Sequence, residues 1–189
     1  MEVLIRGLRY VVTQDERRRV LRDASILVKD GVIEEVGCVK GPVDETIDGE
    51  GLIAIPGLIN THAHVPMTLL RGVADDMELF PWLQEKIWPM ESHLKPHHIE
   101  AGTKLGLLEA IRMGTTTVFD MYFFEDTVAQ VFNEFGVRGV LAEAIIDSGT
   151  PECSNVETCM QLADEFVRRW KESPLVRPGY GPHAPYTDS

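Results

Sequence analysis

The chain has 189 residues, with 18 Lys and Arg against 30 Asp and Glu, which gives a formal net charge of -12. So acidic a chain lacks the basic face that neutralises phosphates, and we expect no nucleic-acid partner. No apolar run approaches the ~20 residues of a membrane-spanning helix and the N-terminus does not resemble a signal peptide, so we expect no membrane partner and a cytoplasmic location. The three cysteines, Cys38, Cys153 and Cys159, are scattered and odd in number, which argues against a disulfide framework.

Residues 1–56 have the pattern of a small β-sheet. Two strand-like runs, Ala24–Lys29 and Val32–Gly37, are separated by an Asp-Gly pair. Such a pair predicts a hairpin, because both central residues of the tight turn need a positive φ. A further short strand, Leu52–Ile55, ends at Pro56, which cannot donate a ladder hydrogen bond.

Beyond Pro56 the pattern changes to alternating strands and helices. The expected strands are Gly57–His64, Thr115–Tyr122, Val137–Ile146 and Val176–Tyr186. The expected helices are His97–Arg112, Thr127–Phe135 and one that a capping box at Ser154–Glu157 opens and that runs to about Trp170. This order implies parallel strands with right-handed crossovers. A closed (β/α) barrel needs eight such strands, so we expect half a barrel whose remainder lies elsewhere, with a four-stranded open sheet as the alternative.

The run Thr61-His62-Ala63-His64 ends the first of these strands. Side chains two positions apart on a strand point to the same face. We therefore expect both imidazoles to project into the barrel at its carboxyl end, where barrel active sites lie. Two neutral imidazoles can supply half the coordination of a divalent ion. On the residues alone, two hydrogen-bonded structural histidines remain an alternative.

Several spaced motifs resemble a known family. The run Pro56–His64 resembles the first-strand signature of the amidohydrolase superfamily. Met67–Asp76, together with Trp82-Leu83 and Trp88–Glu91, is similar to the 5′-methylthioadenosine/S-adenosylhomocysteine deaminases, which are close to chlorohydrolases and guanine deaminases. Gly181–Tyr186 matches the fourth-strand motif of that family.

The resemblance implies an α/β fold in which part of a small β-sandwich domain (residues 1–56) precedes the first four β/α units of a metal-dependent-hydrolase barrel (residues 57–189). It implies one divalent metal ion, zinc in the first place, with iron, manganese and nickel left open. The ion would activate water to attack carbon 6 of an adenine ring, releasing ammonia and an inosine-type product.

Site roles follow from the same resemblance. His62 and His64 match the first-strand metal ligands, Glu91 the carboxylate that grips the ribose hydroxyls, and His183 a substrate-contacting histidine, while Trp82 is expected to wall the pocket. The residues alone also permit a solvated loop glutamate at 91, a structural histidine at 183 and a core tryptophan at 82.

The family's general acid/base glutamate and its remaining metal ligands follow the fifth and eighth strands, so we expect them beyond Ser189. No catalytic acid or base is therefore expected within residues 1–189, and this part alone is expected to be inactive. The full-length protein is expected to be a homo-oligomer with a small nucleoside as substrate.

The stretch Leu141–Glu152 bears on substrate choice. Some family members place arginines there that pair with the homocysteine carboxylate, but this stretch has acidic residues and no arginine. An acidic lining would repel a carboxylate, which favours neutral 5′ groups such as those of methylthioadenosine or 5′-deoxyadenosine. The alternatives are a guanine deaminase or triazine chlorohydrolase, for which Glu91 would have no ribose to hold, and a non-catalytic barrel scaffold.

Overall fold

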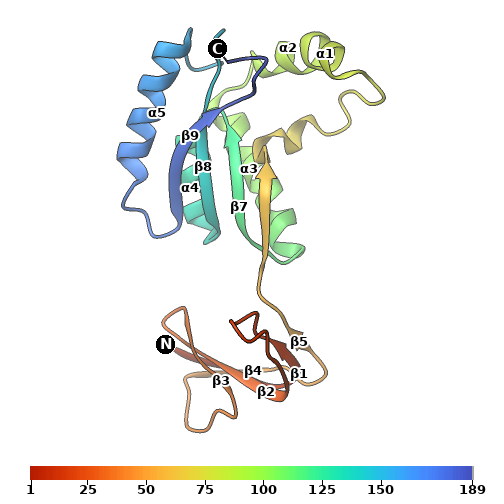
Figure 1. Ribbon diagram of the computed structural model, residues 1–189, viewed down its shortest axis with the longest axis vertical. Coiled ribbons are helices and arrows are strands. Elements are labelled where there is room, and N and C mark those ends of the chain that lie inside the picture. The colour runs from red at the N-terminus through yellow and green to blue at the C-terminus, as the bar shows by residue number, and fades with distance from the viewer. Residues whose placement is uncertain (189) are drawn as a thin grey trace. The chain divides into compact units, whose positions relative to one another are not determined.

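The computed structural model describes residues 1–188. The chain folds as two compact units, Met1–Pro56 and Gly57–Ser189, each with a sheet of its own (Figure 1). None of the helices in the described residues is long and apolar enough to cross a membrane.

The first unit is a mixed sheet. Its strands are β1 (Glu2–Val12), β2 (Val20–Lys29), β3 (Val32–Gly37), β4 (Glu45–Asp48) and β5 (Ile53–Ala54). The order is β3-β2-β1-β4, and β5 also pairs with β1. The predicted hairpin joins β2 to β3, with φ of 48° at Asp30 and 81° at Gly31. The sequence patterns did not single out β1, although it pairs with three other strands and carries the core residues Leu8 and Val11.

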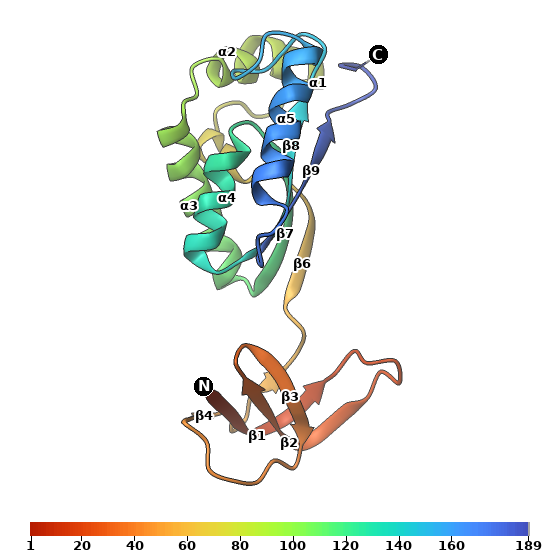
Figure 2. The same ribbon diagram turned by 90° about the vertical axis from the view of Figure 1, so that its left-hand side faces the viewer.

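The second unit holds a four-stranded parallel sheet in the order β6-β7-β8-β9. Its strands are β6 (Leu58–Ala63), β7 (Thr115–Tyr122), β8 (Arg138–Ile145) and β9 (Val176–Pro182). The helices α3 (Pro96–Arg112), α4 (Glu125–Phe135) and α5 (Val156–Trp170) connect successive strands and cover one face of the sheet (Figure 2). The core of the unit includes Leu107, Val118, Phe132, Leu141 and Phe166. The strand–helix alternation and parallel pairing were both predicted, and both are present.

Several boundaries differ from the expectations. The strand β6 ends at Ala63 instead of His64; within the described residues it lies at the edge of the sheet beside β7, and Ile59 is 66% exposed. The strand β9 ends at Pro182 instead of Tyr186, since the amide of Thr187 turns back to the carbonyl of Ala184. The capping box of α5 is shifted by one residue: Asn155 accepts from the amide of Thr158 at 3.0 Å.

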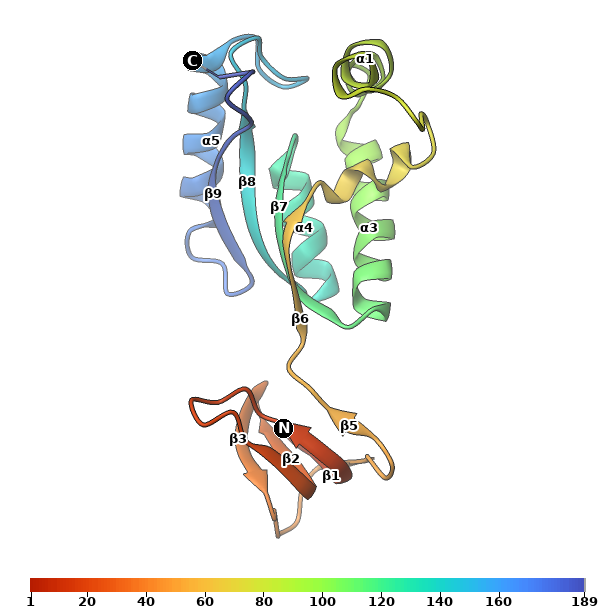
Figure 3. The ribbon, with the colours of Figure 1, turned by 45° about the vertical axis from the view of Figure 1, so that its right-hand side comes forward.

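Short helices lead from β6 to α3: η1 (Val65–Leu70), α1 (Leu79–Trp82), η2 (Leu83–Ile87) and α2 (Trp88–Glu91). Of these, α1 lies beyond the carboxyl end of β7 (Figure 3). Gly102 of α3 lets η1 approach closely, because a Cβ there would lie 2.3 Å from the carbonyl oxygen of Pro66. This contact fixes the segment that directly follows His64.

The expectation about the cysteines is wrong in one respect. Cys153 and Cys159 form a disulfide with a Cα–Cα distance of 5.2 Å, and Cys38 is free and exposed. The bond joins the loop after β8 to the first turn of α5, so it links two neighbouring segments of the chain. The number and spacing of cysteines can indicate disulfides that connect distant segments, but they say little about such a local disulfide.

Candidate active site

The two histidines of the His-x-His run lie side by side. His62 is in β6, and His64 follows the strand as the N-cap of η1. Their ring centroids are 5.1 Å apart with the rings edge to face. Both line an open cavity of about 330 Å³ on the sheet, together with Tyr180 and His183. The predicted pairing of these side chains on one face is therefore present, although His64 itself lies just outside the strand.

The tautomer of His64 is set by its neighbours. Its Nδ1 lies 2.6 Å from the carbonyl oxygen of Met121. A carbonyl can only accept, so Nδ1 carries the proton and Nε2 keeps its lone pair. Next to it, Oδ1 of the buried Asp120 accepts from the amide of Val65 at 2.7 Å and holds the turn after the histidine. A histidine fixed through Nδ1–H to a carbonyl is typical of metal ligands that bind through Nε2.

This donor set fits part of a metal site. His64 offers Nε2, and the ring of His62 is its direct neighbour. Among residues 1–188, no group of three or more His, Cys, Asp or Glu side chains could hold a metal ion. Two imidazoles on one side suit a divalent ion such as zinc as half of its ligands. The residues present therefore fit such an ion without enclosing it.

Glu91 is not a solvated loop residue. It is the last residue of α2, it is 7% exposed, and its Oε1 accepts from the hydroxyl of Tyr122 at 2.7 Å. Burial raises the pKa of the Glu91 carboxyl, and the bond from Tyr122 partly offsets this rise. Burial also raises the pKa of Tyr122, with Glu91 adding to the effect. Tyr122 therefore donates its proton to Glu91 throughout the physiological range.

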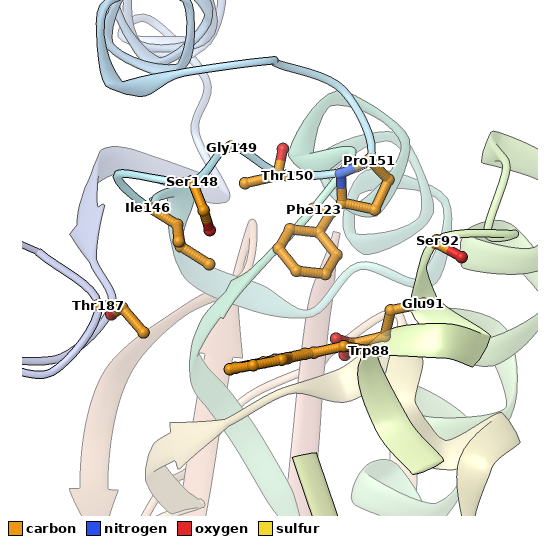
Figure 4. Close-up of a pocket in the computed structure, with 10 residues that line it drawn as sticks. All are labelled: Trp88, Glu91, Ser92, Phe123, Ile146, Ser148, Gly149, Thr150, Pro151 and Thr187. Carbon is orange, nitrogen blue, oxygen red and sulfur yellow. The ribbon is translucent and has the colours of Figure 1, made fainter. Parts of the chain in front are cut away.

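Two cavities meet at Glu91. One, of about 220 Å³, is lined by His64, Trp82 and His183 among others. The other, of about 320 Å³, extends from Glu91 to the loop Ser148–Pro151 (Figure 4). Four residues line both cavities: Trp88, Glu91, Phe123 and Ile146. Of the predicted site residues, His64, Trp82, Glu91 and His183 are thus brought together around one cavity, and His62 lines the open cavity next to it.

His183 follows β9 and is held through its ring. Its Nδ1 lies 2.9 Å from Oγ1 of Thr187, whose hydroxyl donates to the carbonyl of Ala184 at 3.0 Å. Since that hydroxyl proton is already used, Nδ1 of His183 donates and Nε2 is left as an acceptor. Burial lowers the pKa of His183, while Asp188 opposes this effect and His64 adds to it. The ring is therefore held neutral, with one nitrogen free for a ligand.

The expected acidic lining after β8 is wrong. Glu143 is buried and its Oε2 accepts from the amide of Glu125, while Glu152 accepts from the amide of Phe124. Neither carboxyl lines the two cavities at Glu91. Burial is the main reason why the pKa of Glu143 rises to about 9 and that of Glu152 to about 7. Within residues 1–188, no lysine or arginine lines either cavity, so a carboxylate on the 5′ group of a nucleoside would meet no positive charge there. The repulsion expected from Glu143 and Glu152 does not apply, because neither carboxyl lines the cavities.

The sequence patterns missed several residues of this site. Tyr122, which orients Glu91, is the last residue of β7, and Phe123 follows it. Carboxyl ends of parallel strands face the site in α/β folds, so this position was the available signal. Ile146 and the loop Ser148–Pro151 follow β8 in the same way.

Known proteins resemble this chain over most of its length. The model of the amidohydrolase family matches residues 53–189. A 5′-deoxyadenosine deaminase of Methanothrix thermoacetophila is 47% identical over 171 residues, which cover 90% of this chain and 40% of the relative. A 5-methylthioadenosine/S-adenosylhomocysteine deaminase of Halothermothrix orenii is 41% identical, covering 100% of this chain and 44% of the relative.

A solved structure agrees with these matches. An adenosine deaminase of Xanthomonas campestris with bound zinc superposes with a TM-score of 0.93 at 38% identity, covering 98% of this chain and 43% of that protein. The chain thus spans less than half the length of the curated relatives that it matches. The predicted fold, the first half of a metal-dependent-hydrolase barrel after part of a small β-domain, is confirmed by this likeness. The chain belongs to the amidohydrolase family.

Proposed function

We propose that the protein is a metal-dependent hydrolytic deaminase of adenosine-type nucleosides, such as 5′-methylthioadenosine, S-adenosylhomocysteine or 5′-deoxyadenosine. One observation carries the proposal: Glu91 is buried, oriented by Tyr122, and lies where a cavity containing His64 and His183 meets a second cavity. A carboxylate in this place can accept two neighbouring hydroxyl donors through charge-assisted hydrogen bonds, as the 2′ and 3′ hydroxyls of ribose require. The names of the relatives support the same substrate class.

The nucleoside is oriented along the two cavities. Its base lies in the cavity of His64 and His183, where Nε2 of His183 is free to hydrogen-bond with the purine. Trp82, half-buried in the same wall, packs beside the base. Its ribose hydroxyls bind Glu91, and its 5′ group points toward the loop Ser148–Pro151.

His62 and His64 hold the metal ion in this proposal, with zinc as the first choice and iron, manganese or nickel as the alternatives. When bound, a divalent ion acts as a Lewis acid that lowers the pKa of water toward ~7. Residues of this chain orient the ligands: His64 is held in the Nε2-donor tautomer by Met121, and Asp120 holds its turn. The proton-shuttling group is expected beyond Ser189, so residues 1–189 alone are proposed to be inactive.

We extend the proposal to the organisation of the whole protein. Met1–Pro56 is part of the small β-domain, and Gly57–Ser189 forms the first four β/α units of the barrel. Small-molecule nucleosides are the partners, with no nucleic acid or membrane, and the full-length enzyme is a cytoplasmic homo-oligomer.

A different heterocycle is the main competing substrate. A triazine hydrolase of Arthrobacter shares the fold at 27% identity with a TM-score of 0.90. Triazines and guanine carry no ribose. In an enzyme for these substrates, burial of the Glu91 carboxylate would cost free energy without any substrate hydroxyl to bind. A non-catalytic scaffold is disfavoured because both histidines of the first strand are present and paired.

The test is ammonia release by the full-length enzyme loaded with zinc. The substrates to compare are 5′-deoxyadenosine, methylthioadenosine, S-adenosylhomocysteine, guanine and a chlorotriazine. We expect turnover of the adenosine-type nucleosides to inosine-type products and none of guanine or triazine. Turnover confined to guanine or triazine would overturn the proposal, and a metal-free, inactive full-length protein would favour the scaffold.

A further inference from the structure

One wall of the second cavity at Glu91 is the loop Ser148–Pro151, which is attached to a disulfide-bonded cysteine. On the proposed function, this cavity receives whatever the nucleoside carries at its 5′ carbon. Trp88, Phe123 and Ile146 supply its apolar side; Trp88 lies across from the loop Ser148–Pro151, and Phe123 and Ile146 lie between them (Figure 4). Within residues 1–188, no charged side chain except Glu91 lines the cavity, so it suits an uncharged, partly apolar group.

The loop folds back onto Cys153. The amide of Thr150 donates to the carbonyl of Cys153 at 2.8 Å, and Oγ1 of Thr150 lies 3.0 Å from Sγ of Cys153. Gly149 has a φ of 87°, and a Cβ there would lie 2.4 Å from the carbonyl oxygen of Cys153. The position of the cavity wall is therefore tied directly to the position of Cys153.

Cys153 is in turn fixed to the core by its disulfide. Its partner Cys159 is fully buried in α5 and packs in one cluster with Ile145, at the end of β8, and Ala163. Hydrogen bonds hold the loop as well: Glu152 accepts from the amide of Phe124, and the amide of Asp147 donates to the carbonyl of Thr187 at 3.1 Å. Without the disulfide, the loop would keep these hydrogen bonds and lose its covalent attachment to the helix.

We propose that the Cys153–Cys159 disulfide is a positioning element that shapes the pocket for the 5′ substituent. Reduction by an external dithiol takes up two electrons and two protons, converts the bond to two thiols and oxidises the dithiol to its own disulfide. The wall Ser148–Pro151 then loses its fixed position, and a nucleoside with a 5′-methylthio group loses contacts that adenosine never makes. The oxidation state of this pair thus sets which 5′ groups are preferred, and the base and ribose contacts at His183 and Glu91 stay as they were.

The test uses the full-length enzyme and two nucleosides, methylthioadenosine and adenosine. Their dissociation constants are measured through the fluorescence change of the tryptophans, including Trp88 in the pocket wall, and KM and kcat through ammonia release. Each is compared in the oxidised protein, the dithiothreitol-treated protein and Cys153→Ser, with the exposed Cys38→Ser as matched control. Thiol titration establishes the state of the bond.

We expect reduction and Cys153→Ser each to weaken methylthioadenosine binding by about tenfold, the scale of a lost apolar contact in a pocket. Adenosine binding and kcat should change less than about twofold, and Cys38→Ser should behave like the unmodified protein. Loss of the disulfide that leaves both constants unchanged, or that weakens both nucleosides equally, would overturn the proposal. Free thiols at both positions in the protein as isolated would overturn it as well.

The proposed function fails independently of this inference. Binding that shifts on reduction without any ammonia release would contradict the deaminase while supporting the pocket wall. Ammonia release, together with a ratio of the two dissociation constants that does not change on reduction, would support the deaminase and contradict the role of the disulfide. Binding of neither nucleoside would overturn both.

Discussion

The hydroxyl of Tyr122 lies 2.7 Å from Oε1 of Glu91 and joins the end of β7 to the end of α2. Both groups are buried and Glu91 lines both cavities, so the bond occupies one carboxylate oxygen and leaves Oε2 as the acceptor for a ligand. The two residues come from different chain segments, and only the packing of the short helices over the strand ends brings them together.

Tyr122→Phe removes this bond and keeps the ring. We expect kcat/KM for adenosine-type nucleosides to fall about tenfold or more in the full-length enzyme, since a buried carboxylate loses a hydrogen-bond donor. The loss should appear mainly in KM, because ribose binding is affected and the reacting carbon is not. Tyr10→Phe in the first unit is the control and should leave both constants unchanged. Equal constants for Tyr122→Phe and the unmodified enzyme would show that Tyr122 does not orient Glu91.

The buried carboxyls after β8 predict an unusual dependence of stability on pH. The pKa of Glu143 is raised to about 9, chiefly by burial, from its ordinary value of 4.5. The folded protein therefore holds this proton longer than the unfolded chain does, and the free energy of unfolding falls as the pH rises from about 4.5 to about 9. Urea unfolding at several pH values across this window measures the slope.

Glu143→Gln tests the source of that slope. The amide keeps an acceptor for the backbone of Glu125 but cannot ionise. We expect it to flatten the decline in stability between neutral and alkaline pH, whereas the exposed Glu165→Gln should not. A decline as steep as in the unmodified protein would mean that Glu143 does not carry this proton.

Gly102→Ala should disturb the segment that follows His64. The new Cβ would lie 2.3 Å from the carbonyl oxygen of Pro66, so η1 must move away from α3. Overpacking of this kind costs about 1–3 kcal/mol, and we expect a loss of unfolding free energy in that range together with weaker zinc binding. Gly179→Ala is the matched control, because its Cβ would meet nothing closer than 3.9 Å. Unchanged stability and zinc content in Gly102→Ala would contradict the close approach.

His64→Ala should abolish zinc binding by the full-length enzyme, since it removes a nitrogen donor that Met121 holds in the ligating tautomer. Metal content after dialysis gives the readout, and the exposed His93→Ala should retain its zinc. Full zinc occupancy in His64→Ala would place the metal elsewhere.

Local patterns predicted the elements that local physics determines. The β-branched run of β7 gives a strand with the predicted bounds, and the Asp-Gly pair gives the hairpin of β2 and β3. The spacing of His62 and His64 was enough to predict that their rings are neighbours. Each of these features depends on residues that are close in the chain.

Features that depend on tertiary packing were missed or misread. The orientation of Glu143 could not be predicted, because nearly every residue of β8 is buried and no polar alternation distinguishes its two faces. The bond between Tyr122 and Glu91 spans two elements with no common pattern, and the disulfide depends on how the loop after β8 turns back on α5. Such contacts become visible only when the strands and helices have been assembled.

Ribose recognition by Glu91 is tested most directly by a double comparison in the full-length zinc enzyme. The kcat/KM values of methylthioadenosine and its 2′,3′-dideoxy analogue are measured for the unmodified enzyme and for Glu91→Gln. We expect the unmodified enzyme to prefer the hydroxylated nucleoside by about a hundredfold, because buried polar groups discriminate strongly against a ligand that leaves them unpaired. In Glu91→Gln that preference should nearly vanish, and a preference that survives the substitution undiminished would contradict ribose recognition by this carboxylate.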